Sequence, residues 1–139
     1  MHFDMYLQGI PLKKTPARKV IIDIVEKAHR PISAQDIIDE LSRKKIPIDR
    51  VTVFRNVKTL VENDVLIKID FGDGTARYEL KSAPHHHHLV CSRCKNISDI
   101  ESETLHDQIE SVMKKAQKNY GFTIEEHKIE FFGKCKKCT

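Results

Sequence analysis

The residues best suited to chemistry in this sequence are four cysteines, which form two CxxC pairs, Cys91 with Cys94 and Cys135 with Cys138. Each CxxC turn can direct two thiolates at one ion, and two such turns supply the tetrahedral set of thiolates that zinc favours, with bonds of about 2.3 Å. Because four thiolates leave no open coordination position, we expect a structural zinc ion. Disulfide bonds or unliganded buried thiols are the alternative, but the doubled spacing favours metal.

The histidines form the second group of candidate metal ligands. Four of the eight are consecutive, from His85 to His88, immediately before the first CxxC pair. Alternate side chains of an extended segment point to opposite sides, so His86 and His88 should face one way and His85 and His87 the other. One strand can then serve two metal sites. A solvated histidine-rich linker is the alternative interpretation.

Three amphipathic helices are expected in the first half of the chain. Thr15 with Pro16 begins a helix that extends to Ala28, Ser33 caps a second helix, and Asp49 caps a third helix, 50–63. The third helix should bury Val53, Val57, Leu60 and Val61 and should turn a polar, basic face outward, made of Thr52, Arg55, Asn56, Lys58 and Thr59.

The rest of the chain alternates strand and helix signals. Two β-forming runs, 65–71 and 75–80, are joined by a Gly-Asp-Gly turn suited to a hairpin. Residues 81–84 read as a linker, after which short apolar runs at 89–90, 97–100 and 129–132 surround one long helix, 102–119. The predicted fold class is α+β, an N-terminal winged-helix domain followed by a small α/β domain.

Composition sets broad limits on function. The formal charge of +4 comes from 24 basic and 20 acidic residues, which is a mixed surface rather than a basic tail. A chain of 139 residues that makes two small domains would benefit from a metal ion or a dimer interface. We expect a cytoplasmic protein without a membrane partner, because the sequence has no apolar run of membrane-spanning length and no signal-peptide pattern.

Several motifs together resemble the ferric uptake regulator family, which includes iron, zinc, manganese and peroxide sensors. The segments are TPAR, RVTVFRNVKTL, RYELKSAPHHHHLVCSRC and YGF…H…IEFFGKCKKC, and in order and spacing they match the family over residues 12 to 138. The resemblance implies a winged-helix DNA-binding domain (1–81), a hinge (82–86) and a dimerisation and metal-binding domain (87–139). It implies a homodimeric, metal-responsive repressor that binds double-stranded operator DNA, controls metal-homeostasis or peroxide-response genes, and is not an enzyme.

The resemblance also implies three kinds of metal site. The family's structural zinc site corresponds to the four cysteines, and its regulatory site at the hinge corresponds to Glu79, His86, His88 and Asp99. A further family ligand falls at Pro31, and His29 is the nearest histidine that could replace it. An additional site maps to His85, His87, His106 and His127, where imidazoles at His87 and His106 replace common carboxylates and favour zinc. Fe(2+), Zn(2+) and Mn(2+) all suit the regulatory site.

In this family the third helix reads DNA, and the resemblance places Thr52, Phe54 and Arg55 on it. The family commonly has tyrosine where this chain has Phe54, which keeps an apolar ring for a thymine methyl group but lacks the hydroxyl. Arg55 can form hydrogen bonds with a phosphate or with the edge of a guanine, and Lys58 can contact a phosphate. Lys13, at the start of the domain, can reach into a neighbouring groove.

Two other functions remain open from the sequence. A metalloenzyme could hold a catalytic zinc ion at the histidine run, although the chain has no HExxH motif. A constitutive DNA-binding protein with structural zinc alone is the other possibility.

Overall fold

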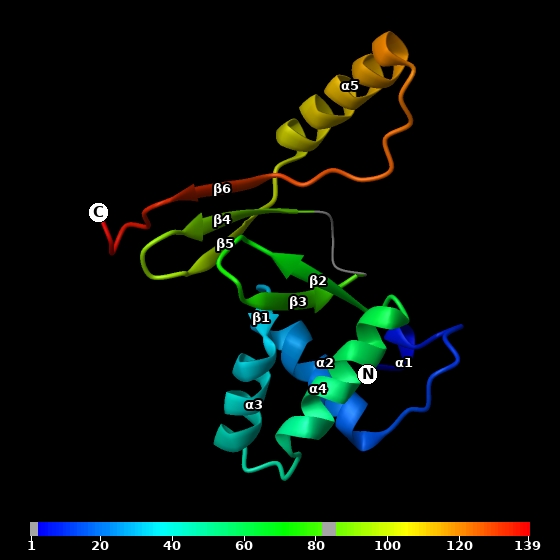
Figure 1. The fold of residues 1–139 in the computed structure, drawn as a ribbon, viewed down its shortest axis with the longest axis vertical. Coiled ribbons are helices and arrows are strands. Elements are labelled where there is room, and N and C mark those ends of the chain that lie inside the picture. Colours follow the sequence, from blue (N-terminus) through cyan, green and yellow to red (C-terminus); the bar gives the residue numbers. More distant parts are fainter. Residues whose placement is uncertain (1–2, 82–85) are drawn as a thin grey trace. The chain divides into compact units, whose positions relative to one another are not determined.

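A computed structural model describes residues 3–81 and 86–139 (Figure 1). It divides into two compact units, Met1–Ala83 and Pro84–Thr139, which are described separately. The first contains α1 (Phe3–Tyr6), α2 (Pro16–Ala28), β1 (Ile32–Ser33), α3 (Ala34–Arg43), α4 (Arg50–Glu62), β2 (Leu66–Asp70) and β3 (Ala76–Leu80). The second contains β4 (His87–Cys91), β5 (Ile97–Ile100), α5 (Glu103–Tyr120) and β6 (Glu130–Gly133).

The three main helices of the first unit begin at the residues that the sequence predicts. Side-chain oxygens of Thr15, Ser33 and Asp49 accept hydrogen bonds from backbone N–H groups in the first turns of α2, α3 and α4. These bonds satisfy N–H groups that have no carbonyl partner within the helix. At α3 the Asp36 carboxylate also accepts from the Ser33 N–H, which completes a capping box.

The first unit is a winged helix, as predicted. Its sheet has the order β1-β3-β2, and the antiparallel pair β2 and β3 forms the wing. The turn between them requires glycine, because Gly72 and Gly74 have φ angles of 82° and 79°. Apolar residues from α1 to α4 and from the sheet form one core, which includes Ile21, Ile37, Val53, Leu60 and Leu66.

Two elements of this unit were not predicted. Strand β1 contributes only two residues, with Ile32 opposite Tyr78, which is too short to give an alternating pattern. Helix α1 has four residues and is followed by Leu7, which is buried in the core. The Tyr6 hydroxyl donates a hydrogen bond to the Glu26 carboxylate and so ties α1 to α2.

The outer face of α4 differs from the predicted polar, basic face. Val51 is 60% exposed and Phe54 is 46% exposed, so apolar side chains lie among the cations. Asn56, Thr52 and Thr59 are half-buried rather than turned fully outward, and Val61 is also half-buried. The Asn56 amide oxygen accepts a hydrogen bond of 3.1 Å from Arg18 Nε, which explains why this polar residue turns toward α2.

The second unit is a small α/β unit, as predicted. Its sheet has the order β5-β4-β6, with β4 antiparallel to β5 and parallel to β6. Ser102 caps α5, and Gly121 ends it with a φ angle of 61°. None of the residues of α5, all of which the structure describes, is buried. Across the described residues of both units, no helix is long and apolar enough to span a membrane.

Candidate metal centres and nucleic-acid interface

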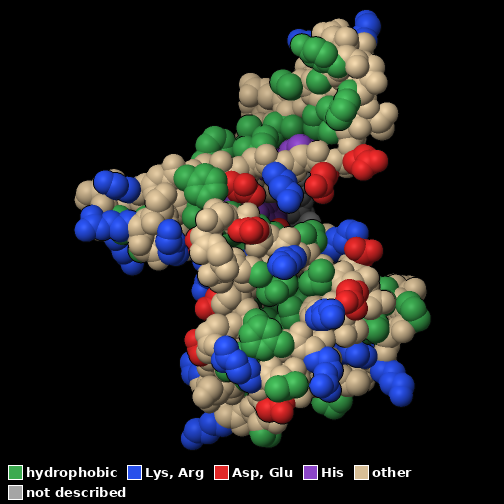
Figure 2. Space-filling view, in the orientation of Figure 1, with side chains coloured by type: hydrophobic (Ala, Val, Ile, Leu, Met, Phe, Trp, Pro, Cys, Tyr) green, Lys and Arg blue, Asp and Glu red, His purple; other side chains and the backbone are tan. Residues whose placement is uncertain are grey.

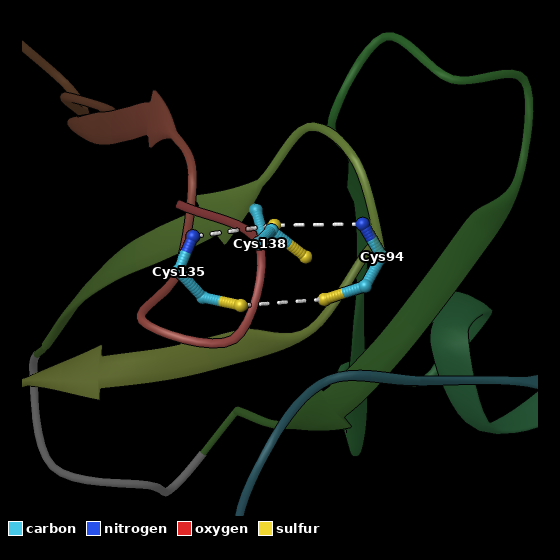
Figure 3. A group of neighbouring side chains, drawn as sticks. Cys94, Cys135 and Cys138 are labelled. Atoms are coloured by element: carbon cyan, nitrogen blue, oxygen red, sulfur yellow. Dashed lines mark hydrogen bonds between the residues drawn. The ribbon is translucent and has the colours of Figure 1, made fainter.

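The four cysteine sulfurs meet in the second unit. Figure 3 labels three of these residues, Cys94, Cys135 and Cys138. Cys91 ends β4, Cys94 follows in the turn before β5, and Cys135 and Cys138 lie in the turn after β6. All four sulfurs lie within 4.8 Å of one another, and Cys94 Sγ is 3.6 Å from Cys135 Sγ. A tetrahedral zinc ion with bonds of about 2.3 Å separates its sulfur ligands by about 3.8 Å, so this geometry fits zinc.

Backbone groups favour ionised sulfur at this cluster. The N–H groups of Cys94 and Cys135 each donate to Cys91 Sγ at 3.4 Å, and these two bonds lower the pKa of Cys91 to about 5. Hydrogen bonding to Cys135 and burial raise the pKa of Cys138. Four neighbouring thiols therefore cannot all ionise by themselves, whereas a divalent cation stabilises the ionised set.

A second group of candidate ligands lies where β4 and β5 pair. His88 lies directly opposite Asp99 in this antiparallel pair, so the two side chains share one face. His86 Nε2 and His88 Nε2 lie 3.9 Å and 3.8 Å from the same Asp99 oxygen. The two imidazole rings are 4.9 Å apart between centroids, and both side chains are almost completely buried. Two imidazoles and a carboxylate suit Fe(II), Mn(II) or Zn(II).

The neighbouring histidine takes the opposite face of β4, as alternation requires. The His87 ring lies 5.5 Å from the His127 ring, between centroids. His106 lies on the first turns of α5, where its Nε2 is 3.7 Å from a Glu110 oxygen. The structure therefore brings two members of the additional site together and places the third on the helix. His85 lies outside the described residues.

The remaining candidate ligands belong to the first unit. Glu79 lies on β3, opposite Ile67, and is half-buried. His29 is exposed and ends α2 in the left-handed conformation, with a φ angle of 54°. This conformation is uncommon for residues other than glycine, so His29 already has a local structural role as the helix cap.

Helix α4 carries most of the predicted DNA contacts. Arg55 and Lys58 are exposed, and the side-chain nitrogen of Lys58 is 3.9 Å from a Glu62 oxygen. Thr52 is half-buried and donates its backbone N–H to Asp49. Lys13 is exposed in the segment before α2, where its carbonyl accepts a hydrogen bond from Arg18 Nη1.

Phe54 is at the surface of α4 and is not a core aromatic. Its ring lies beneath the guanidinium group of Arg50, whose Cζ is 5.3 Å from the ring centroid. Arg50 Nη1 donates to Gln35 Oε1 on α3 at 2.7 Å, so a side chain of the preceding helix anchors the guanidinium. The sequence alone predicts no role for Arg50 or Gln35 in this interface. Their spacing carries no local signal, because the two residues meet only when α3 and α4 pack.

The sequence of this chain is similar to those of known proteins. The model of the ferric uptake regulator family matches residues 10–132. The ferric uptake regulation protein of Bacillus subtilis is 35% identical over 136 residues, which cover 95% of this chain and 89% of that protein. The peroxide-responsive repressor PerR of Staphylococcus epidermidis is 27% identical over 132 residues, which cover 95% of this chain and 85% of that protein.

Solved structures give the same fold. The ferric uptake regulator of Francisella tularensis with iron has a TM-score of 0.79 and 23% identity, and the alignment covers 94% of this chain and 96% of that one. A zinc-bound manganese uptake regulator has a TM-score of 0.77 and 22% identity, and the alignment covers 97% of this chain and 99% of that one. The winged helix, the small α/β unit and the matches over almost the whole sequence lead to one conclusion: this chain belongs to the ferric uptake regulator family.

Proposed function

We propose that this protein is a metal-responsive repressor that binds operator DNA as a homodimer in the cytoplasm and is not an enzyme. One observation carries the proposal: a winged-helix unit with exposed cations on α4 is joined in one chain to a unit with two sets of metal ligands. The relatives named for ferric uptake regulation and for peroxide response support a role in metal-homeostasis or peroxide-response genes. The domain roles we assign are DNA binding for 1–81, a hinge at 82–86, and dimerisation with metal binding for 87–139.

The four cysteines would hold structural zinc. Their sulfur geometry supports a closed tetrahedral site, and the ion would connect the start of the second unit to residues near its end. Metal binding to such a site contributes directly to folding, because the unfolded chain has no preformed site.

The regulatory ion would be held by His86, His88 and Asp99 together with Glu79, with His29 as a further candidate. Proximity of the two imidazoles and the Asp99 carboxylate supports the first three ligands. Glu79 is a ligand in this proposal because its position in RYELKSAPHHHHLVC matches the family's motif. Fe(2+), Zn(2+) and Mn(2+) are the candidate ions, and relatives with bound iron and zinc support that choice.

An additional zinc site would use His85, His87, His106 and His127. The closeness of the His87 and His127 rings supports half of this set. The third described member, His106, would bind from α5, where Glu110 lies 3.7 Å from its Nε2.

DNA contacts would come from Lys13, Thr52, Phe54, Arg55 and Lys58. Exposure of Arg55, Lys58 and Lys13 supports contacts with phosphates, which supply most of the affinity of such interfaces. Phe54 has an exposed apolar ring that could meet a thymine methyl group.

A homodimer would cover apolar surface that the second unit leaves exposed. Leu89, Phe131 and Phe132 lie on neighbouring strands of its sheet and are each about half exposed, and Val112 on α5 is 66% exposed. Exposed apolar groups of this extent mark interaction surfaces in soluble proteins.

The test is metal-dependent DNA binding. Protein purified from its own host is analysed for metals, and the weaker ion is then removed with a chelator while the cysteine-bound zinc is retained. Affinity for duplexes selected from a random pool should fall, and one of the three ions should restore it. Unchanged affinity after chelation would favour constitutive DNA binding, and metal-dependent hydrolysis without DNA binding would favour an enzyme.

A further inference from the structure

The surface of α4 contains an apolar residue that the proposed function does not use. Val51 lies in the first turn of the helix and is 60% exposed, although valine is usually buried. It lies three residues before Phe54, so the two side chains share one face of the helix. Together with Arg50, Arg55 and Lys58 they line one surface depression.

The chemistry of this depression is mixed in a specific way. Three cations surround two apolar side chains, which fits a partner that presents negative charge around apolar groups. The major groove of DNA does this, because phosphates border it and the C5 methyl group of each thymine projects into it. A purely electrostatic contact would have no use for an exposed valine and phenylalanine.

Phe54 is held in place for such a contact. The Arg50 guanidinium covers one side of the ring, and Gln35 of α3 anchors that guanidinium, while the Gln35 amide nitrogen donates to Asp39 at 2.9 Å. A ring fixed by its neighbours loses little side-chain entropy on binding. Arg50 is therefore a positioning residue, and Val51 is free to make the second apolar contact.

We propose that Val51 and Phe54 together form a methyl-reading surface that selects thymine at defined operator positions, with Val51 as a specificity-determining residue. The inference rests on the proposed DNA-binding function and names the feature of the DNA that the helix reads. Burial of one methyl group contributes roughly 0.8 kcal/mol, which corresponds to about a fourfold change in affinity.

The experiment removes the methyl group from the DNA and the apolar group from the protein separately. The metal-loaded protein first selects a duplex from a random pool. Each thymine in that duplex is then replaced in turn by deoxyuridine, which keeps every hydrogen-bonding group and loses only the C5 methyl. The dissociation constant of the parent protein should rise about fourfold at the positions that Val51 or Phe54 contacts.

Val51→Ala is measured on the same duplexes. We expect it to bind the thymine duplex more weakly and to lose the preference for thymine over uracil at one position that the parent discriminates. Alanine favours the helix more than valine does, so destabilisation of α4 should not contribute. Val51→Thr is the second variant, because it keeps the branched shape but replaces one methyl group with a hydroxyl.

Lys58→Ala is the matched control on the same face of α4. It should weaken binding to the thymine and uracil duplexes equally, since a phosphate contact does not depend on the methyl group. If Val51→Ala and Val51→Thr both keep the parent's preference for thymine at every position, the inference is wrong while the proposed function stands. If the parent itself binds no selected duplex in a metal-dependent way, the proposed function fails instead.

Discussion

At the scale of single residues, chemistry concentrates on side chains held by short-range contacts. Cys91 receives two backbone N–H groups, His88 lies opposite Asp99, and Phe54 lies beneath Arg50. In the roles proposed above, the thiolate and the imidazole would bind a metal ion, and the aromatic ring would contact a base. Substitutions at this scale should therefore separate metal binding from DNA binding.

Replacing Cys91 tests the structural zinc site. Cys91→Ser should lose the tightly bound zinc and lower the melting temperature of the protein, because three thiolates and a hydroxyl coordinate zinc poorly and the metal contributes to folding. Zinc content by elemental analysis and thermal unfolding measure the two effects. Ser92→Ala, at the adjacent exposed position, should change neither. A Cys91→Ser protein with full zinc content would exclude Cys91 as a ligand.

Replacing Arg55 tests the role of α4. Arg55→Ala should weaken binding to the selected duplex by about tenfold or more, because a lost base or phosphate contact costs roughly 1 to 3 kcal/mol, and it should retain zinc. Titrations at several salt concentrations measure the loss. Lys27→Ala removes the same charge from α2 and serves as the control. If the parent and Arg55→Ala bind the duplex with equal affinity at all salt concentrations, Arg55 does not contact the DNA.

At the scale of elements, the two sheets serve different purposes. The wing is a hairpin in which Arg77 on β3 forms an ion pair of 2.8 Å with Asp73 in the turn. This ion pair holds the turn against the strand. The sheet of the second unit instead leaves apolar side chains uncovered: Leu89 on its central strand lies beside Phe131 on β6, and both are nearly half exposed. Figure 2 shows hydrophobic side chains at the surface of this unit and on α5. That uncovered surface predicts a second copy of the chain.

A charge placed on this face should prevent dimerisation. Leu89→Glu would put a carboxylate among apolar residues, and burying it without a partner would cost several kcal/mol. Light scattering should give the mass of a monomer, while zinc content stays at the parent level. Gln8→Glu adds the same charge to the first unit as a control. A Leu89→Glu protein that keeps the dimer mass would show that the second copy packs elsewhere.

At the scale of the whole molecule, the regulatory site proposed above would connect metal sensing to DNA binding. The two recognition helices of a twofold dimer must lie about 34 Å apart to meet successive major-groove turns. In the proposed mechanism, metal would act by selecting the population of dimers in which the two helices have this spacing. Linkage then requires that bound DNA raises metal affinity by the same factor.

His88→Ala tests this coupling. The variant should keep the cysteine-bound zinc and the dimer, because neither uses the His88 imidazole, but it should lose the increase in operator affinity on addition of metal. Metal titrations of DNA binding measure the response. His2→Ala, which replaces a histidine that is not among the proposed ligands, is the matched control. A normal metal response in His88→Ala would show that the histidine run is a linker and does not hold the regulatory ion.

The sequence alone determined the features that depend on neighbours along the chain. Helix starts at Thr15, Ser33 and Asp49 follow from side chains that bond the N–H group three residues later, and strand alternation separates His87 from His88. The CxxC spacing likewise predicted which sulfurs meet. In each case the cause is local geometry, which a sequence displays directly.

Tertiary structure decided what covers each face. Helical periodicity places Val51 and Asn56 on α4, but only packing against α2 turns Asn56 toward Arg18, and only the packed structure shows that Val51 is 60% exposed. The anchoring of Arg50 by Gln35 and the contact of α1 with the core have the same origin. Burial depends on residues distant along the chain, so hydrophobicity alone cannot distinguish a core valine such as Val53 from an exposed one such as Val51.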